Sequence, residues 1–341
     1  MPVQQQIFRL TRALLMLICL IALFGSRVAC ADDTKRISNT VSVKAKGAEF
    51  DVYFNVVAKQ QNTVEPTGAI DPNEPSFFII HGFMDTAGNT ENDFQPAQWM
   101  LKIADSIRSG KAIACGRSTN IILVDWSVGA GESLGDYFRV LQNIELVGDA
   151  IWKYMTRNNI DPRRSILIGH SLGGHIAGAA GTEIKSTVPN RELRAIIGID
   201  EAGFGFESAD EAKMLDATDA RTVISFKTSA WCGNQRHLAT SSFFVNPIRD
   251  ESGNLLGYQH PNIKATYRDL SKLNIEADRQ SHLYGREVLV PKLLLTGYLP
   301  GANADTNLAT LLSTEHRKED IHTDDKRFAV SKAQSVALRR L

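Results

Sequence analysis

Five short apolar runs, separated by amphipathic segments, dominate the hydrophobic pattern between residues 77 and 228. Each run is apolar at successive positions, which is typical of strands buried on both faces of a parallel sheet. Residues 99–107 and 140–154 carry apolar side chains at helical spacing. This alternation predicts an α/β protein whose largely parallel central sheet is covered by helices on both faces. The runs are Phe77–Ile80, Ile121–Trp126, Ser165–Gly169, Ala195–Asp200 and Thr222–Thr228.

Other segments extend or interrupt this pattern. Ile37–Val57 alternates apolar and polar residues, which predicts antiparallel strands at one sheet edge. Thr63–Pro75 is rich in Pro, Gly and Asn and is predicted to be a loop. Ala230–Asp278 contains no long apolar run, and such a long irregular segment inside a domain is usually functional. His282 immediately precedes Leu283–Leu295, which again has helical periodicity.

The first 31 residues have the pattern of a secretory signal peptide. Arg9 and Arg12 precede the apolar run Ala13–Phe24, and Ala29–Ala31 supplies a small-residue cleavage site. The apolar run is too short to span a bilayer. Cleavage and secretion are therefore predicted, with an uncleaved anchor as the alternative.

Composition limits the partners of the mature protein. The chain has 38 basic and 38 acidic side chains, and loss of three N-terminal arginines leaves a net charge of −3. A nearly neutral surface argues against nucleic acid as a partner, and no later apolar run reaches transmembrane length. Residues 32–300 are predicted to form one domain, residues 301–341 are predicted to be a polar, charged and solvated tail, and no protein partner is indicated.

Two cysteines remain after cleavage, Cys115 and Cys232. Cys115 precedes one predicted strand, whereas Cys232 follows another, so a parallel arrangement separates them by about 15 Å. A disulfide requires Cα atoms within roughly 7 Å. No disulfide is predicted.

A Gly-His-Ser-Leu-Gly sequence at residues 169–173 is the main chemical signal. A predicted strand leads into it and a small-residue helical pattern follows, which is the setting of a nucleophile elbow. Ser171 is the candidate nucleophile. The N–H of Leu172 is one candidate donor to an oxyanion, and the N–H of Phe83, after the turn at His81-Gly82, is the second.

A serine nucleophile needs a base and an acid that orients the base. Asp200 ends a predicted strand at the same sheet edge as the serine, although an Asp there can also cap the next turn. Among later histidines, His282 is favoured because its helix fixes its position. His170 and His175, which flank the elbow, are expected to make local contacts. The alternatives that remain open for the base are His237, His260, His316 and His322.

Taken together, the motifs resemble the animal neutral, pancreatic-type lipase family, which includes phospholipases A1 and yolk-protein relatives. The resemblance covers residues 40–298 and implies an α/β-hydrolase fold. It assigns Ser171 as nucleophile, Asp200 as acid and His282 as base, with Phe83 and Leu172 as oxyanion donors. The matching segments are residues 78–83, 124–126, 169–175, 198–203, 216–220 and 281–282.

The resemblance also implies a structural calcium loop. Asp216 and Asp219 would supply carboxylate oxygens, and the carbonyls of Glu211 and Met214 would complete the ligand set. The alternative is a solvated acidic turn. No cofactor is expected to be required for the chemistry.

Four positions depart from the family pattern. Glu201 stands where a proline is usual, Lys227 where a histidine is usual, and Gly174 where an alanine is common. Gln280 occupies the place of a cysteine, so a disulfide-closed lid is not expected.

These features predict a secreted serine carboxylic ester hydrolase that acts on lipid esters at an interface. The 81 residues between Asp200 and His282 leave room for a lid, placed at residues 254–278, and favour triacylglycerol as substrate. A phospholipase A1 is the first alternative. A non-catalytic lipid-binding or yolk-type storage protein is the second.

Overall fold

The computed structural model describes most of the chain from residue 39 to residue 298. The described ranges are 39–45, 47–59, 63–110, 118–188, 190–206, 213–249, 255–260 and 275–298, together with residues 252, 308 and 312. The predicted signal peptide, most of the predicted tail and Cys115 lie outside these ranges. No helix in the described ranges is long and apolar enough to cross a membrane.

One twisted sheet forms the centre of the molecule, with the strand order β1-β2-β5-β4-β6-β7-β8-β9. The strands from β5 to β9 pair in parallel, whereas β1 and β2 pair antiparallel at one edge, as the sequence predicted. The short strand β3 also pairs with β2. The strands are β1 Thr40–Ala45, β2 Ala48–Val57, β3 Val64–Glu65, β4 Ser76–Ile80, β5 Asn120–Asp125, β6 Ser165–His170, β7 Ala195–Ile199, β8 Val223–Lys227 and β9 Ser241–Phe244.

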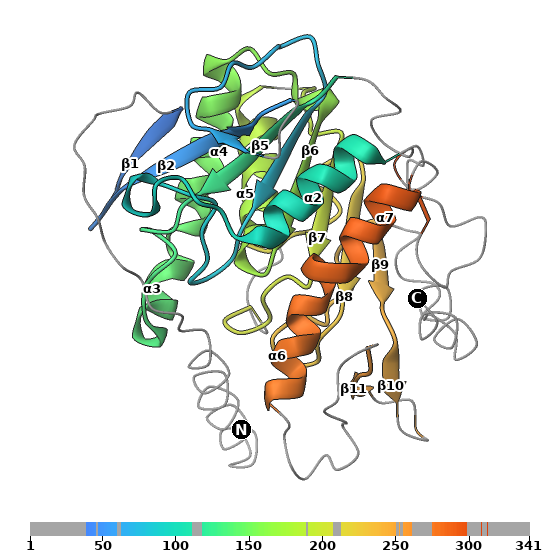
Figure 1. The fold of residues 1–341 in the computed structure, drawn as a ribbon. Coiled ribbons are helices and arrows are strands. Elements are labelled where there is room, and N and C mark those ends of the chain that lie inside the picture. The colour runs from blue at the N-terminus through green and yellow to red at the C-terminus, as the bar shows by residue number, and fades with distance from the viewer. Residues whose placement is uncertain are drawn as a thin grey trace.

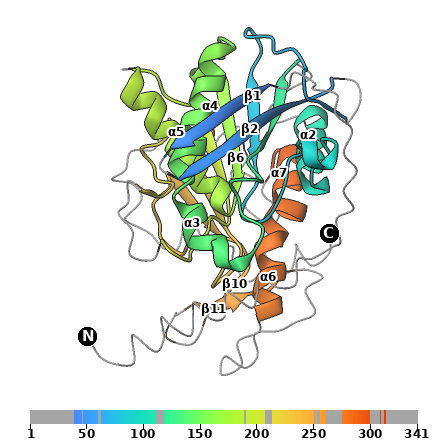
Figure 2. The same ribbon diagram turned by 90° about the vertical axis from the view of Figure 1, so that its left-hand side faces the viewer.

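Helices cover both faces of the sheet (Figures 1 and 2). One hydrophobic cluster joins the sheet to α4 and α5, and a second joins the opposite face to α2 and α7. Both faces are therefore buried, which explains why most positions of the central strands are apolar on both faces. The helices are α2 Gln98–Ser109, α3 Tyr137–Leu141, α4 Ile144–Arg157, α5 Leu172–Thr187, α6 Ile275–Tyr284 and α7 Val290–Thr296.

The helical segment at His282 differs from the prediction. Helix α6 begins at Ile275, so His282 lies within the helix rather than before it. A π-helical turn, Gly285–Leu289, then leads into α7. Pro291 has no N–H to donate to the Glu287 carbonyl, which instead accepts a hydrogen bond from Lys102 Nζ at 2.7 Å. The proline thus removes one backbone hydrogen bond where the π-helical turn joins α7.

Three further differences concern short elements. The predicted helix over residues 140–154 is two helices, α3 and α4, separated at residues 142–143. The irregular segment after residue 230 contributes β9 to the central sheet and a separate hairpin of β10, Pro247–Arg249, with β11, Leu255–Tyr258. These strands have three or four residues, too few to show a periodicity.

The domain extends beyond the boundary predicted at residue 300. Leu308 and Leu312 are buried in the same cluster as α2 and α7. The Leu308 N–H also donates to the Gly297 carbonyl at 2.7 Å. At least this part of the predicted tail therefore packs on the domain.

Candidate active site

Ser171 forms the turn between β6 and α5. Its backbone has φ 56° and ψ −122°, a conformation that side chains disfavour and that nucleophile elbows adopt. A Cβ at Gly82 would lie 2.8 Å from the Ser171 Cβ, and one at Gly169 would lie 2.1 Å from the Gly173 carbonyl oxygen. Glycine at these positions therefore allows the adjacent loop and helix to approach the serine.

Asp200 follows β7 at the same edge of the sheet and is fully buried. Its Oδ1 accepts hydrogen bonds from the N–H groups of Thr228 at 2.6 Å and Ser229 at 3.0 Å. Its Oδ2 accepts a further hydrogen bond from the Ser229 hydroxyl. The loop after β8 thus holds the carboxylate in one orientation.

His282 contacts that carboxylate from the last turn of α6. Its Nδ1 lies 2.7 Å from Asp200 Oδ2, and its side chain is 13% exposed. When Nδ1–H donates to the carboxylate, the neutral ring carries its lone pair on Nε2, the nitrogen that can act as a base. His282 and Ser171 line the same cavity. The structure therefore brings together the three residues that the sequence indicated.

His170 supports the helix that carries His282. The two rings have their centroids 4.5 Å apart, and His170 Nε2 donates to the His282 carbonyl at 3.1 Å. Arg286 Nη1 lies 3.4 Å from His170 Nδ1, which is then the acceptor nitrogen. Burial, followed by the charge of Arg286, holds the pKa of His170 well below its usual range. This neutral ring makes the local contacts that the sequence predicted.

The loop that follows β4 carries Phe83, one of the two candidate oxyanion donors. His81 anchors this loop, because its Nδ1 donates to the Gly82 carbonyl at 2.8 Å and its Nε2 accepts from the Trp126 N–H at 3.1 Å. Gly82 and Phe83 line the cavity of the nucleophile. The second candidate donor, Leu172, begins α5 directly after the serine.

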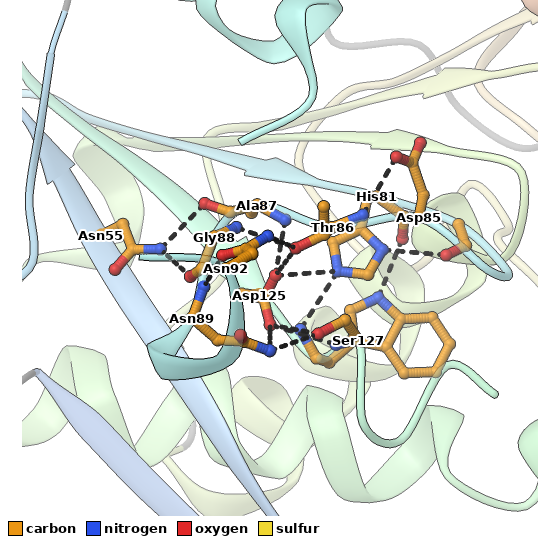
Figure 3. A network of polar contacts seen from close by, with 12 residues as sticks. Asn55, His81, Asp85, Thr86, Ala87, Gly88, Asn89, Asn92, Asp125 and Ser127 are labelled. Carbon is orange, nitrogen blue, oxygen red and sulfur yellow. Dashed lines mark hydrogen bonds and ion pairs between the residues drawn. The ribbon is translucent and has the colours of Figure 1, made fainter. Parts of the chain in front are cut away.

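Asp125, at the end of β5, organises the same loop (Figure 3). It is fully buried, and its Oδ2 accepts from the Thr86 hydroxyl at 2.7 Å and from the Ala87 N–H at 2.6 Å. Its Oδ1 accepts from the Ser127 hydroxyl at 2.8 Å. Sequence reasoning assigned this residue no role, although its position at a strand end, beside Trp126, was an available signal.

Arg286 links α6 to the loop after β4. Its Nη1 lies 2.5 Å from Asp85 Oδ2, and its guanidinium lies 4.9 Å from the centroid of the Trp99 ring. The Trp99 indole N–H also donates to Asp85, at 3.0 Å. Burial raises the pKa of Asp85, but the charge of Arg286, together with that of His81 and the hydrogen bonds from Thr86 and Trp99, outweighs burial and holds the pKa below its usual value.

The cavity at Ser171 and His282 has a volume of about 210 Å³. Aromatic and other apolar side chains form much of its wall, together with Arg279 of α6 and Arg286 of the π-helical turn that follows it. An apolar wall beside a serine, histidine and aspartate suits an ester with an acyl chain. The residues of the wall include Phe83, Met84, Tyr137, Cys232, Arg279 and Arg286.

Comparison with known proteins agrees with this geometry. Residues 39–299 match the family model described as Lipase. The chain belongs to the Lipase family. A phospholipase A1 of Vespa crabro is 30% identical over 233 residues, 65% of this chain and 70% of that relative. A phospholipase A1 of Vespula squamosa is 30% identical over 233 residues, 67% of this chain and 72% of that relative.

Membership of the Lipase family confirms three of the predictions from sequence. The resemblance is confirmed, the fold is that of an α/β hydrolase, and the protein is a carboxylic ester hydrolase that acts on lipid esters. The alternative of a non-catalytic storage protein is disfavoured because Ser171, His282 and Asp200 are all present and come together in the structure.

Three departures from the Lipase family pattern meet in one buried cluster. Glu201 Oε2 lies 2.6 Å from Lys227 Nζ, and both side chains are almost fully buried. Ser225 donates its hydroxyl hydrogen to the same carboxylate oxygen at 2.9 Å. A Cβ at Gly174 would lie 2.6 Å from Glu201 Cγ. The lysine therefore balances the unusual glutamate, and the unusual glycine leaves space for it.

Asp278 is a second residue that sequence reasoning missed. This buried carboxylate on α6 accepts hydrogen bonds from three consecutive N–H groups, those of Ala230 at 2.8 Å, Trp231 at 3.1 Å and Cys232 at 2.8 Å. Asp278 thus joins α6, the helix that carries His282, to the loop after β8, which also donates hydrogen bonds to Asp200. In the sequence, the only signal for Asp278 was an acidic residue one helical turn before the candidate base His282.

The predicted calcium ligands lie in a turn beside α5. Asp219 Oδ1 accepts from the Thr182 hydroxyl at 2.8 Å, and its Oδ2 accepts from the Asp216 N–H at 2.9 Å. Asp216 Oδ1 accepts from the Thr218 N–H at 2.6 Å. Glu211 lies outside the described residues, and within them no three potential metal-binding side chains cluster. These contacts are those of a self-capped turn, so a calcium ion here stays a prediction.

The other histidines that the sequence left open as the base have different surroundings. His260 is buried, and its Nε2 lies 2.7 Å from the Thr228 carbonyl oxygen. His237 packs on Phe244, with ring centroids 4.7 Å apart. His316 and His322 lie outside the described residues. Neither His237 nor His260 is among the residues that line the cavity of Ser171.

The predicted lid is described only in part. Tyr258 is fully buried, and Leu255 packs against it in a small cluster with Ala230 and Phe244. This part forms strand β11 rather than a cover over Ser171. Residues 261–274 lie outside the described residues.

Proposed function

We propose that this Lipase family member hydrolyses lipid esters through an acyl-enzyme on Ser171. The contact of 2.7 Å between His282 and Asp200, in the cavity that holds a strained serine, carries the proposal. A serine hydroxyl becomes a nucleophile only when a base accepts its proton, and the aspartate keeps that base in the required tautomer.

The reaction then follows from the roles of these residues. His282 Nε2 takes the proton of Ser171 as Oγ attacks the ester carbonyl, and it returns this proton to the alcohol that leaves. Water attacks the acyl-enzyme, gives a proton to His282, and releases the fatty acid as Ser171 is reprotonated. The N–H groups of Phe83 and Leu172 are the donors to the negative oxygen of both tetrahedral intermediates.

Of the two substrate classes, we propose a phospholipid, with triacylglycerol as the second candidate. The relatives reported above are named phospholipases A1. Arg279 and Arg286 also line the cavity, but each pairs with a carboxylate, Glu276 and Asp85 respectively, so the names of the relatives carry this choice. The length argument for triacylglycerol is weaker, because β8, β9, the β10–β11 hairpin and part of α6 occupy much of the segment between Asp200 and His282.

Secretion is also part of the proposal. It is supported by the basic, apolar and small-residue pattern of residues 1–31. Lipid aggregates outside the cell would then be the substrate.

Labelling with a fluorophosphonate tests the nucleophile. The wild type should be labelled and should hydrolyse a short soluble ester, whereas Ser171→Ala should lose the label and at least roughly 10⁴-fold in kcat. Ser133→Ala removes an exposed serine hydroxyl and should behave as wild type. Full labelling of Ser171→Ala would show that another residue is the nucleophile.

The same preparations rank the substrates. Phosphatidylcholine and trioleoylglycerol, presented in identical mixed micelles, should give the higher kcat/KM for phosphatidylcholine. A higher value for trioleoylglycerol would reverse the order of the two candidates.

A further inference from the structure

Phe138 is the most exposed large apolar side chain within the part of the chain that the structure describes, at 63%. It belongs to α3, a helix of five residues. A phenylalanine in this position leaves a large apolar area in water, which a soluble protein usually avoids unless the area meets a partner.

Two other aromatic residues extend this apolar area to the catalytic cavity. The Phe138 ring lies 6.1 Å from the Tyr137 ring and 5.5 Å from the Phe204 ring, measured between centroids. Tyr137 and Phe204 are 5.4 Å apart. Tyr137 is also a wall of the cavity that holds Ser171 and His282. We refer to Tyr137, Phe138 and Phe204 as the aromatic rim.

The aromatic rim is held in place by contacts on its inner side. The Tyr137 hydroxyl donates to the Phe204 carbonyl at 2.9 Å, and the Tyr137 ring packs edge-on against Phe83 at 5.0 Å. Gly205, with φ 85°, leaves space for Leu141 of α3, because a Cβ there would lie 2.7 Å from Leu141 Cδ1. A preorganised surface loses little conformational entropy when it binds.

The position of the rim suits a flat apolar surface. Helices α3 and α6 lie at the same end of the molecule in both views (Figures 1 and 2), and Tyr137 of α3 and His282 of α6 line one cavity. The charges that flank Phe138 cancel, since Arg139 Nη2 lies 2.9 Å from Asp136 Oδ1. Because this pair leaves no net positive charge, attraction to the rim depends on apolar contact rather than on anionic headgroups.

We propose that the aromatic rim is the surface by which this hydrolase rests on aggregated lipid, with Phe138 inserted among the acyl chains and Tyr137 leading from that surface to Ser171. The inference rests on the proposed function for its substrate, but binding to lipid can be measured without turnover. Aromatic side chains are well suited to the boundary between water and acyl chains.

The test uses Phe138→Glu and a matched control. Leu295→Glu introduces the same charge at a side chain that is 46% exposed on α7, away from α3 in both views. Binding to pure phosphatidylcholine vesicles is measured by cosedimentation in a Ser171→Ala background at 0.15 M and 0.5 M NaCl. Hydrolysis of a short soluble ester and of the vesicle lipid is measured in the active background.

Phe138→Glu should lower vesicle binding and vesicle hydrolysis at least tenfold, because transfer of a phenylalanine ring from water into apolar surroundings favours binding by at least tenfold. Hydrolysis of the soluble ester should stay within about twofold of the wild type. Leu295→Glu should leave vesicle binding and vesicle hydrolysis unchanged. Raising NaCl to 0.5 M should not release the protein from the vesicles. Unchanged vesicle binding by Phe138→Glu, or an equal loss in Leu295→Glu, would overturn the proposal. The proposal would also be overturned if Phe138→Glu dissociated a dimer and retained vesicle binding, because the rim would then contact a second copy of this chain.

The two proposals can fail separately. If the wild type neither reacts with fluorophosphonate nor hydrolyses any ester, the proposed function fails. The vesicle-binding comparison in the Ser171→Ala background still decides whether the rim binds lipid.

Discussion

Glu201 places a carboxylate in the interior one residue after the acid that contacts His282. Its partner Lys227 precedes Thr228, whose N–H holds Asp200. The ion pair thus connects the two strand ends that position the Asp200 carboxylate. A buried charge without a partner is costly, whereas a buried pair and a neutral replacement can have similar stability.

At this scale we expect Glu201→Gln to lower the free energy of unfolding by about 3 kcal/mol, because Lys227 then remains buried without a counter-charge. The double variant Glu201→Gln/Lys227→Met removes both charges and should recover most of this loss. Urea unfolding of the wild type, both single variants and the double variant measures the coupling. Equal losses in the single and double variants would show that the two charges do not compensate each other.

The side chain of Asp278 connects helix α6 to the loop after β8. Asp278 accepts three N–H groups from residues 230–232, and His282 follows one turn later. In the Lipase family pattern a cysteine is expected at Gln280, which here contacts only Glu276 among the described side chains. The carboxylate of Asp278 supplies a non-covalent connection in the same helix.

For helix α6 we expect Asp278→Ala to lower the free energy of unfolding by about 2–4 kcal/mol, because the three N–H groups that donate to Asp278 lose their acceptor. Ester hydrolysis should fall as well, since His282 is less well held against Asp200. The control Glu276→Ala removes a partly exposed carboxylate from the same helix and should cost less than about 1 kcal/mol. A wild-type midpoint in urea for Asp278→Ala would exclude this role.

At the scale of the whole molecule, three buried histidines within the described ranges, His170, His175 and His260, have disfavoured charged forms. Burial lowers the pKa of His175 and of His260 to about 4, and burial with the charge of Arg286 lowers that of His170 further below its usual range. In the unfolded chain each histidine would titrate near 6.5. Between these values the unfolded state binds more protons, so stability must fall as the pH falls.

We therefore expect the free energy of unfolding to decrease from pH 6.5 to pH 5, by roughly 2 kcal/mol for each of His175 and His260 at pH 5. His260→Gln, which can still donate to the Thr228 carbonyl, should show a shallower dependence by that amount. Urea unfolding at half-unit intervals between pH 5 and pH 7.5 measures both slopes. A stability independent of pH in this window would contradict the burial of neutral histidines.

Local pattern was sufficient for much of this protein. The five central strands appear within about one residue of their predicted limits, because strands buried on both faces are apolar at every position. Ser171 and Asp200 could be located because each directly follows such a strand, and parallel strands end at one edge of the sheet. His282 came from the family resemblance, since several histidines satisfied the order along the chain.

Contacts between distant residues required the three-dimensional arrangement. Glu201 and Lys227 are 26 positions apart, and the sequence marks each as a departure from the family pattern without showing that the two form a pair. Phe138 and Phe204 belong to segments too short for a periodicity, and Leu308 lies in a stretch whose composition suggested a solvated tail. Periodicity reports which face of one element is buried, whereas pairing of charges and joining of apolar patches depend on which elements pack together.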